Sequence, residues 1–432
     1  MSSEMQEGIY YRSKPPMGNS LCFISLRSDD SSKIMETGKI IVQIWNRLRD
    51  LKEGILADLK IDPKHRKRGG LSVLIGYGPR IFEIKDSKKT RPLNFNTEWN
   101  FKQPNPQGGG VIVDGSNIKY SSNINENHLL YDHIIFQLIA ENEFYTSRAA
   151  VEIWKELRRW NKHSKSTPLR ITGMYAGFQR ADRRNWQGFH DGISNLKRQE
   201  RPYVISIDSR NLSSMDKWIA GGSYLAFMRI SIDLESWEDL NIREQEKLIG
   251  RDKLTGCPLI KIDKYGNPVK DSRCPVRGTT EVIESGNEYF RDYPAHLTRF
   301  EDKLLQYSHI RKSRPSDRVP FWDRKSSRIY RQGFEFLSAS SNNQTFIMGL
   351  NFISFQNSPE RLMRALTYRN KISSVDPHPN VINTVERYFS VSAAGVFFVP
   401  PVVRGEIFPG AKIFFGERDL RILASELSRK IS

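Results

Sequence analysis

Residues 224–233, YLAFMRISID, alternate apolar and polar side chains, which is typical of a β-strand with one buried face. A Glu- and Leu-rich segment follows, and its apolar spacing predicts a helix over Ser236–Ile249. After a long polar insertion the pattern continues with predicted strands over Arg328–Phe336 and Phe346–Ser354, a helix over Ser358–Tyr368 and a strand over Gly395–Val399. This half of the chain therefore predicts strand-helix-strand twice, the split βαβ order.

The first half of the chain repeats this order. Predicted strands and helices alternate over Leu21–Leu26, Ile34–Leu51, Leu71–Ile75, His133–Ala140, Thr146–Trp160 and Ile171–Phe178, where the second and fifth segments are helices. Thr146 or Ser147 is the expected N-cap of the second helix. We therefore predict an α+β fold of two ferredoxin-like domains with antiparallel sheets, residues 1–215 and 216–432, joined near the polar stretch Ser209–Lys217.

Two long segments, Pro79–Asn127 and Leu254–Arg324, contain little periodic structure and many Pro, Gly, Asn and charged residues. Loops of this length within compact domains are usually functional or disordered. The second segment contains His309, which favours a functional role for it.

The composition of the 432-residue chain fits a globular protein, with 38% hydrophobic residues and no stretch long and apolar enough to span a bilayer. Residues 1–20 carry neither an apolar signal region nor a twin-arginine start, so we expect a cytoplasmic protein. The cysteines, Cys22, Cys257 and Cys274, are far apart and odd in number, which predicts free thiols in a reducing compartment.

The formal charge of +18 raises the question of an anionic partner. Tryptophans interleave with the basic residues, and such a combination can bind single-stranded nucleic acid. The basic residues are spread over different segments, however, and no nucleic-acid-binding motif is present. A solvated basic surface is the better explanation, and a nucleic-acid-binding protein without a cofactor is the least favoured function.

Three local patterns carry residues that a haem peroxidase needs. His309 lies in YSHIRK, residues 307–312, and a neutral imidazole is a good iron ligand. Its nearest rival is His296, and the other histidines lie in charged, polar or strand positions. An isolated histidine is usually structural, so His309 depends on its context.

Asp191 lies in GFHDG, residues 188–192, between Gly188 and Gly192. Flanking glycines let the backbone approach a flat cofactor closely, because no Cβ stands in the way. A carboxylate there can accept a proton from hydrogen peroxide and return it to the departing oxygen. The competing explanation is an ordinary Asp-Gly turn.

Arg331 begins Arg-Gln-Gly at the end of an apolar stretch. Its guanidinium stays charged and presents several donors, so it can stabilise negative charge that develops on a peroxide oxygen. A surface ion pair is the competing explanation in so basic a chain.

Taken in this order, the three patterns resemble the dye-decolorising peroxidase family over most of the chain. Further segments fit that resemblance: residues 71–79, 220–225, 229–233, 249–256, 349–356 and 397–401. The chain departs from the family pattern after His309, where residues 313–317 read SRPSD, and at Gln332, where a second arginine is common.

The resemblance implies haem b held mainly by the C-terminal domain, with His309 as axial ligand and Asp191 and Arg331 on the opposite, distal side. It places Leu350 and Phe352 beside the peroxide pocket and Arg311 near a haem propionate. An acid that accepts a hydrogen bond from the axial imidazole would raise its donor strength, and Glu386 and Asp376 are both candidates.

The favoured function is therefore a haem-dependent peroxidase, with hydrogen peroxide and an organic reductant as partners. The positive charge makes anionic reductants such as sulfonated dyes an expectation. A haem-handling protein with incidental peroxidase activity is the alternative, since its pocket residues would be identical. The sequence leaves homo-oligomerisation open.

Overall fold

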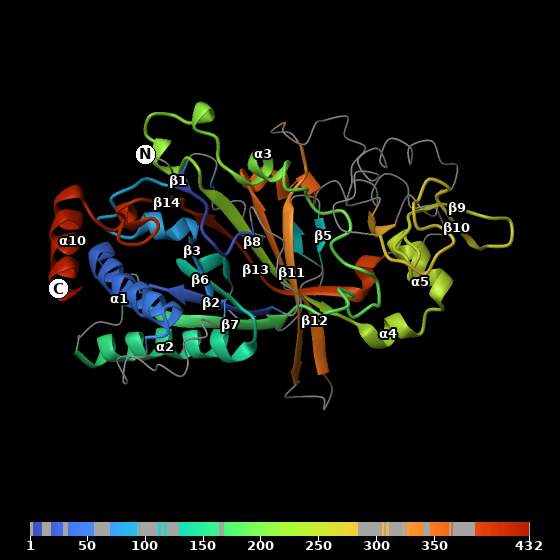
Figure 1. Cartoon of the computed structure of the whole chain (residues 1–432), viewed down its shortest axis with the longest axis horizontal. Helices are drawn as coiled ribbons and strands as arrows, with labels where there is room; N and C mark the ends of the chain where they lie inside the picture. Colours follow the sequence, from blue (N-terminus) through green and yellow to red (C-terminus); the bar gives the residue numbers. More distant parts are fainter. Residues whose placement is uncertain are drawn as a thin grey trace.

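The computed structural model of the protein describes residues 3–10, 19–28, 33–55, 70–92, 95, 111–113, 116–118, 129–163, 168–283, 305, 308–310, 323, 326–339, 346–362, 364–365 and 385–431. Eight strands form a closed antiparallel barrel at its centre (Figure 1). They are β2 (Ser20–Arg27), β3 (Ser72–Tyr77), β6 (Ile134–Ala140), β7 (Arg170–Phe178), β8 (Ser223–Ile232), β11 (Tyr330–Ala339), β12 (Phe346–Gln356) and β13 (Phe389–Val399).

The barrel consists of two four-stranded halves with the same topology. The order around it is β11-β12-β8-β13-β3-β6-β2-β7. Each half therefore places its first and third strands in the middle and its second and fourth at the edges, which is the ferredoxin-like arrangement. The predicted α+β fold with ferredoxin-like, antiparallel halves is confirmed. The predicted domain boundary at residue 215 falls between β7 and β8 and stays a prediction.

The two halves meet at their edge strands. β13 pairs with β3 through Phe398 and Tyr77, and β11 pairs with β7 through Glu335 and Phe178. Closing the barrel removes the open sheet edges that would otherwise offer unpaired backbone groups. The second junction brings the end of β7 next to β11, and it forms one end of the cavity described below.

Apolar side chains cover both faces of the sheets. One set fills the space between the two halves, where Phe23 of β2 stacks on Phe227 of β8 with ring centroids 4.2 Å apart. Another packs under α1 (Ile34–Lys52) and α2 (Glu143–His163), which lie side by side along the N-terminal half (Figure 1). Because both faces are buried, β6 is apolar at nearly every position instead of alternating.

The remaining helices and strands are short apart from the C-terminal helix. They are β1 (Ser3–Glu4) paired with β14 (Val402–Val403), β4 (Val111–Val113) with β5 (Ser116–Ile118), β9 (Leu259–Ile262) with β10 (Pro268–Lys270), α3 (Arg201–Ile205), α4 (Leu234–Glu238), α5 (Ile242–Ile249) and α10 (Glu417–Ile431). Neither α10 nor the β9–β10 hairpin inside the long second loop was predicted from the sequence. Among the described residues, no helix is sufficiently long and apolar to cross a membrane.

Two predicted helices differ from those observed. The helix predicted over Ser236–Ile249 is broken into α4 and α5, because Asn241 and Glu244 form a reciprocal capping box that starts a new helix. The helix predicted from Thr146 begins three residues earlier, and the Thr146 hydroxyl bonds instead to the Glu143 carbonyl inside the first turn. Of the helix predicted over Ser358–Tyr368, residues 359–362 and 364–365 are helical, and residues 363 and 366–368 lie outside the described residues. Ser358 precedes the helix, and its hydroxyl accepts a hydrogen bond from the Glu360 N–H at 3.3 Å.

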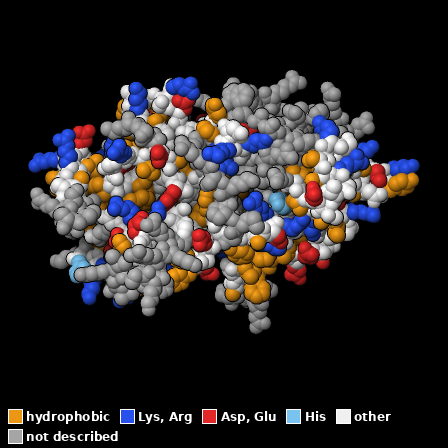
Figure 2. All heavy atoms as spheres, viewed as in Figure 1, with side chains coloured by type: hydrophobic (Ala, Val, Ile, Leu, Met, Phe, Trp, Pro, Cys, Tyr) orange, Lys and Arg blue, Asp and Glu red, His pale blue; other side chains and the backbone are white. Residues whose placement is uncertain are grey.

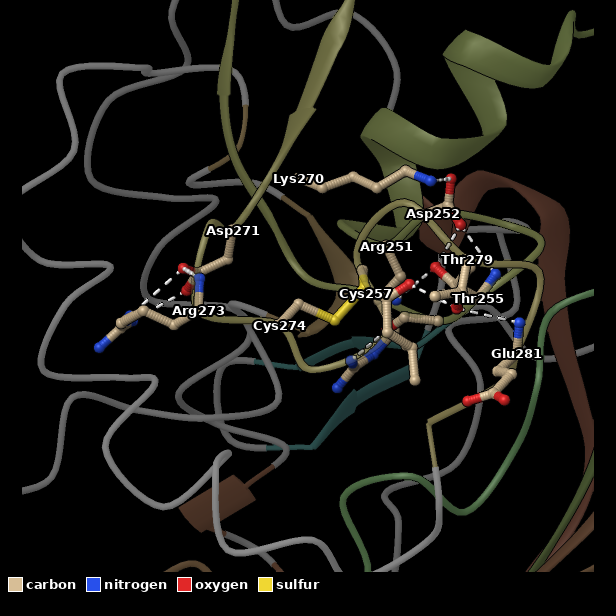
Figure 3. Close-up of a disulfide and its surroundings, with 12 residues drawn as sticks. Arg251, Asp252, Thr255, Cys257, Lys270, Asp271, Arg273, Cys274, Thr279 and Glu281 are labelled. Carbon is tan, nitrogen blue, oxygen red and sulfur yellow. Dashed lines mark hydrogen bonds and ion pairs between the residues drawn. A yellow bond between two sulfur atoms is a disulfide. The ribbon is translucent and has the colours of Figure 1, made fainter.

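The prediction of free thiols is wrong for two of the three cysteines. Cys257 and Cys274 form a disulfide whose Cα atoms lie 6.0 Å apart (Figure 3). Cys22 is buried and free. The hairpin of β9 and β10 returns the chain so that residues 17 positions apart meet, which spacing alone does not reveal. The disulfide packs against Ile193 and Ile283 in a small cluster.

We expect the double variant Cys257→Ser/Cys274→Ser to lose about 3 kcal/mol of unfolding free energy, the chain-entropy value for a loop of this length. Denaturant unfolding followed by tryptophan fluorescence measures the loss. The wild type treated with a strong thiol reductant serves as the matched comparison and should unfold at the same midpoint as the variant. Equal stability of oxidised wild type and variant would contradict the assigned stabilising role.

Candidate active site

A cavity of about 670 Å³ lies between the C-terminal half of the barrel and the segment that follows β7. Its wall includes Asp191, Gly192, Arg331, Leu350 and Phe352, five of the residues predicted from the sequence. These residues come from positions up to 161 apart in the chain, from Asp191 to Phe352, and only the fold brings them together. Gly188 and His309 are not among the described residues that line it.

The strand register arranges the barrel side of the cavity. Side chains of a strand alternate between its faces, so Arg331, Gly333 and Glu335 share the cavity face of β11. On β12, Phe352 pairs with Gly333 and Leu350 pairs with Glu335. The predicted apolar residues therefore stand beside the predicted arginine because β11 and β12 are hydrogen-bonded in this register.

Gly333 leaves the space that the Asp191 carboxylate occupies. A Cβ atom built on it would lie 3.2 Å from Asp191 Oδ2 and 3.1 Å from Leu350 Cδ1, closer than most such contacts. Any larger residue at this position would push against Asp191 or Leu350. The missing side chain thus lets the carboxylate lie over the strand between Arg331 and Glu335.

Three side chains of the segment that follows β7 form hydrogen bonds to the backbone of β11. The Gln179 amide donates to the Gly333 carbonyl at 3.0 Å, and the Trp186 indole N–H donates to the Phe336 carbonyl at 3.1 Å. Asn195 makes a reciprocal pair with the backbone of Arg331, at 2.7 and 3.1 Å. Asp191 lies within this segment, so its position relative to Arg331 is set by bonds to the same strand.

The backbone around Asp191 requires its two glycines. Gly188 and Gly192 have φ of +83° and +80°, a conformation that other residues rarely adopt. The Asp191 N–H donates to the Arg183 carbonyl at 2.9 Å, and its Oδ1 accepts from the Gly192 N–H at 2.6 Å. The side chain itself is exposed to the cavity.

Gly188 lies against the side chain of Lys253, whereas the sequence predicted that it would approach a cofactor. A Cβ on Gly188 would lie 2.6 Å from Cε of Lys253, whose side chain fills the space beside it. Lys253 Nζ in turn bonds to Gln245 Oε1 of α5. The close approach that this glycine permits is therefore to a lysine stem, and a cofactor contact at Gly188 has no support in the described residues.

His309 lies in a short described segment, residues 308–310, and is half-buried. This segment packs on Gly250, the C-cap of α5, where a Cβ would lie 2.7 Å from both Ile310 Cγ1 and Ser308 Oγ. The next residue, Arg251, donates a hydrogen bond at 2.9 Å to Oγ of Ser194, which lies three positions after Asp191. The turn at 250–251 therefore contacts the His309 segment on one side and the Asp191 segment on the other.

The remaining predicted site residues fall outside the described part of the chain. They are Arg311, Asp376 and the rival ligand His296. The backbone of Glu386 belongs to a described 3-10 helix, Val385–Tyr388, but its side chain is outside as well. The choice between Glu386 and Asp376 as partner of the axial imidazole stays open.

The cavity wall is strongly basic. Besides Arg331 it contains Arg180, Arg183, Arg184, Lys197, Arg198 and Arg201, against the acids Asp191 and Glu335. Some of these cations already have partners, such as Arg180 with Asp182 and Arg184 with the carbonyls of Lys253 and Leu254. Elsewhere Lys and Arg are scattered over the viewed face and form no single stripe (Figure 2). The cavity wall therefore carries more basic than acidic side chains, which favours anions.

Glu335, Asn195 and Gln179 belong to this site but were not predicted from the sequence. Glu335 follows Arg331 by four residues, so the strand period of two was a signal that both side chains share a face. Asn195 and Gln179 had no such signal, because their partners are backbone atoms of a distant strand.

A model of the family described as "Dyp-type peroxidase, C-terminal" matches residues 182–404, more than half of the chain. Deferrochelatase of Escherichia coli K12 is 25% identical over 240 residues, which cover 55% of this chain and 46% of that protein. The chain therefore spans about half the length of the curated relatives that it matches.

Solved structures of similar fold support this placement. DtpA from Streptomyces lividans, solved as an oxyferrous complex, superposes with a TM-score of 0.64 at 19% identity over 93% of this chain and 94% of that one. A DypB variant from Rhodococcus jostii in complex with heme gives a TM-score of 0.57 at 18% identity, over 92% and 97%. At these identities the likeness shows the fold, and the family follows from the matched model. This chain belongs to the Dyp-type peroxidase family.

Proposed function

We propose that the protein is a haem-dependent peroxidase, which reduces hydrogen peroxide and oxidises organic reductants in single-electron steps. The observation that carries the proposal is the convergence of Asp191, Arg331, Leu350 and Phe352 on one cavity. An acid, a fixed cation and an apolar pair are what peroxide cleavage requires of a protein: a proton carrier, a charge stabiliser and a wall that limits water.

The cavity fits haem b by size and charge. Its volume of about 670 Å³ lies within the range of cofactor pockets, roughly 300–1,000 Å³. Haem b carries two carboxylate groups, and the basic wall supplies guanidinium and ammonium partners for them. Glu335 lines this wall, and its buried carboxyl oxygens have no partner of hydrogen-bond geometry among the described residues.

Haem b would be held by the His309 imidazole and, at one of its carboxylate groups, by Arg311, and it would supply iron for peroxide chemistry and single-electron transfer. Asp191 would accept a proton from hydrogen peroxide and return it to the departing oxygen. Arg331 stabilises the negative charge that develops on that oxygen. Leu350 and Phe352 keep bulk water away from it.

The test is a visible spectrum of the purified protein with and without added haemin, followed by peroxide and a sulfonated dye. We expect a Soret band and peroxide-dependent bleaching of the dye. A protein without a Soret band after loading would overturn the proposal, and this outcome would also revive the cofactor-free nucleic-acid-binding alternative.

The name of the curated relative, deferrochelatase, keeps haem handling as the second candidate function. The same assay separates the two when a ferrous-iron chelator is added. Iron release that exceeds dye turnover would favour haem handling, whereas turnover without release favours the peroxidase. The cytoplasmic location expected from the sequence stays a prediction, which cell fractionation can check.

Anionic reductants are proposed as the preferred class because of the basic cavity wall. We expect kcat/KM for a sulfonated dye to fall about tenfold between 0.02 and 0.3 M salt, since screening weakens steering. A neutral phenol is the matched substrate and should change less than twofold. An equal fall for both substrates would contradict a preference for anions.

A further inference from the structure

We infer that Glu335 is a second proton-holding group of the cavity, which delivers protons that Asp191 does not supply when peroxide is reduced to water. This inference rests on the proposed peroxidase function. Glu335 belongs to none of the sequence segments that carry the family resemblance.

The stoichiometry of the reaction creates the need for such a group. Reduction of one hydrogen peroxide to two waters takes two electrons and two protons. The O–O bond breaks, and the electrons come from the organic reductant, which is oxidised by one electron twice. The proton that Asp191 takes from peroxide and returns to it only moves within the substrate. Two further protons therefore have to enter the cavity, one for each electron.

Glu335 is placed to supply them. It lies two residues beyond Gly333 on the cavity face of β11, which is about 7 Å along the strand. Asp191 Oδ2 lies next to Gly333. It pairs with Leu350 on one side and Phe178 on the other, so it stands where β7 closes the barrel. Glu335 and Asp191 are the two acids among the described residues of the cavity wall.

The Glu335 carboxyl is buried, and the described residues give it no hydrogen bond of ordinary geometry. The residue is 6% exposed, and neither carboxyl oxygen has a partner in hydrogen-bond geometry among the described residues. Such groups normally carry a bound partner or a function. The residue lines the cavity while both carboxyl oxygens are themselves shielded from water, so proton exchange with the cavity requires a small movement of this side chain.

Its charged surroundings keep the carboxyl exchangeable at neutral pH. Burial raises the pKa of Glu335 to about 7; the Arg180 guanidinium and the Trp186 backbone N–H oppose the rise, while the carboxylates of Asp191 and Asp182 add to it. Arg180 is largely engaged by Asp182, at 2.7 Å. The group is therefore neutral below about pH 7, where it holds a proton that it can release.

The test follows re-reduction of the haem-loaded protein by ferrocyanide after one equivalent of peroxide, as the return of the Soret band to its resting position. Ferrocyanide donates electrons without protons, so protons have to come through the protein. For the wild type we expect about a tenfold fall in rate between pH 6 and pH 8 as Glu335 loses its proton. Glu335→Gln should be flat over this range, within twofold, at about the wild-type rate of pH 8.

Two control variants make the result specific. Glu335→Asp keeps a carboxyl and should retain a pH-dependent fall. Glu406 is an acid of the same kind, with a pKa that burial raises to about 7, but it is not among the described residues of the cavity wall. Glu406→Gln should keep the wild-type profile. A pH-dependent fall that persists unchanged in Glu335→Gln would overturn the inference.

A measurement on the haem-free protein separates this inference from the proposed function. The folded pKa of about 7 exceeds the ordinary value of 4.5, so the folded state loses stability as pH rises from about 4.5 to 7. The Tm of Glu335→Gln should therefore equal that of the wild type at pH 4.5 and exceed it at pH 8. A parallel Tm profile would overturn the inference even if the peroxidase assay succeeds; failure of haem loading with divergent profiles would overturn the proposed function alone.

Discussion

Replacing Asp191 with asparagine is expected to slow the reaction of the haem-loaded protein with hydrogen peroxide by about 10²–10⁴-fold, the usual contribution of a positioned acid-base group. Asparagine keeps the size and the hydrogen-bond acceptor for the Gly192 N–H, but it cannot take up a proton. The measurement is the stopped-flow change of the Soret band after mixing with peroxide. Haem content should stay at the wild-type level.

Arg331→Leu is expected to have an effect of similar size, because one preorganised donor at a developing anion contributes about 10²–10³-fold. The backbone of Arg331 would still pair with Asn195, so the loop should keep its position. Asp239→Asn provides the control, since that exposed carboxylate lies at the end of α4 and outside the cavity wall. Wild-type peroxide rates in both Asp191→Asn and Arg331→Leu would remove the basis of the proposed roles.

Replacing His309 with alanine is the third change with a large expected effect. Loss of outer partners of a metal ligand usually costs 10–100-fold in affinity, so removal of the axial ligand itself should weaken haem binding by at least about 100-fold. Haemin titration followed at the Soret band measures this. The band should also shift in the variant, and added imidazole should restore its position by replacing the lost side chain.

Two further variants control for the choice of histidine. His163→Ala removes an exposed histidine at the end of α2 and should leave haem affinity unchanged. His296→Ala tests the rival ligand named from the sequence. If His296→Ala lost haem and His309→Ala kept it, the axial role would pass to His296.

The alternation of side chains along β11 indicates one more residue of the site, Glu335, in addition to Arg331. Arg331 was found from its local motif, and the period of two along the same strand already placed Glu335 on its face. What the period does not reveal is whether that face borders a cavity or solvent. Glu335 lies where β7 pairs with β11 through Phe178, and this pairing joins segments 157 residues apart.

The sequence by itself determined the eight strands of the barrel, most of the longer helices, the ferredoxin-like order of each half and the residue types of the cavity. These follow from local forces, because side-chain periodicity and turn residues act over a few positions. It did not determine the break at Asn241 or the Cys257–Cys274 bond, both of which depend on competing local caps or on a hairpin return.

Only the tertiary structure decided which distant residues meet. The pairing of β11 with β12 places Leu350 and Phe352 beside Glu335 and Gly333, and the fastening by Asn195 fixes Asp191 over the same strand. Register is set by the burial of whole sheet faces and by barrel closure, which are sums over many residues far apart in the chain. For this reason the cavity, its basic wall and its second acid emerge from the fold and from no single motif.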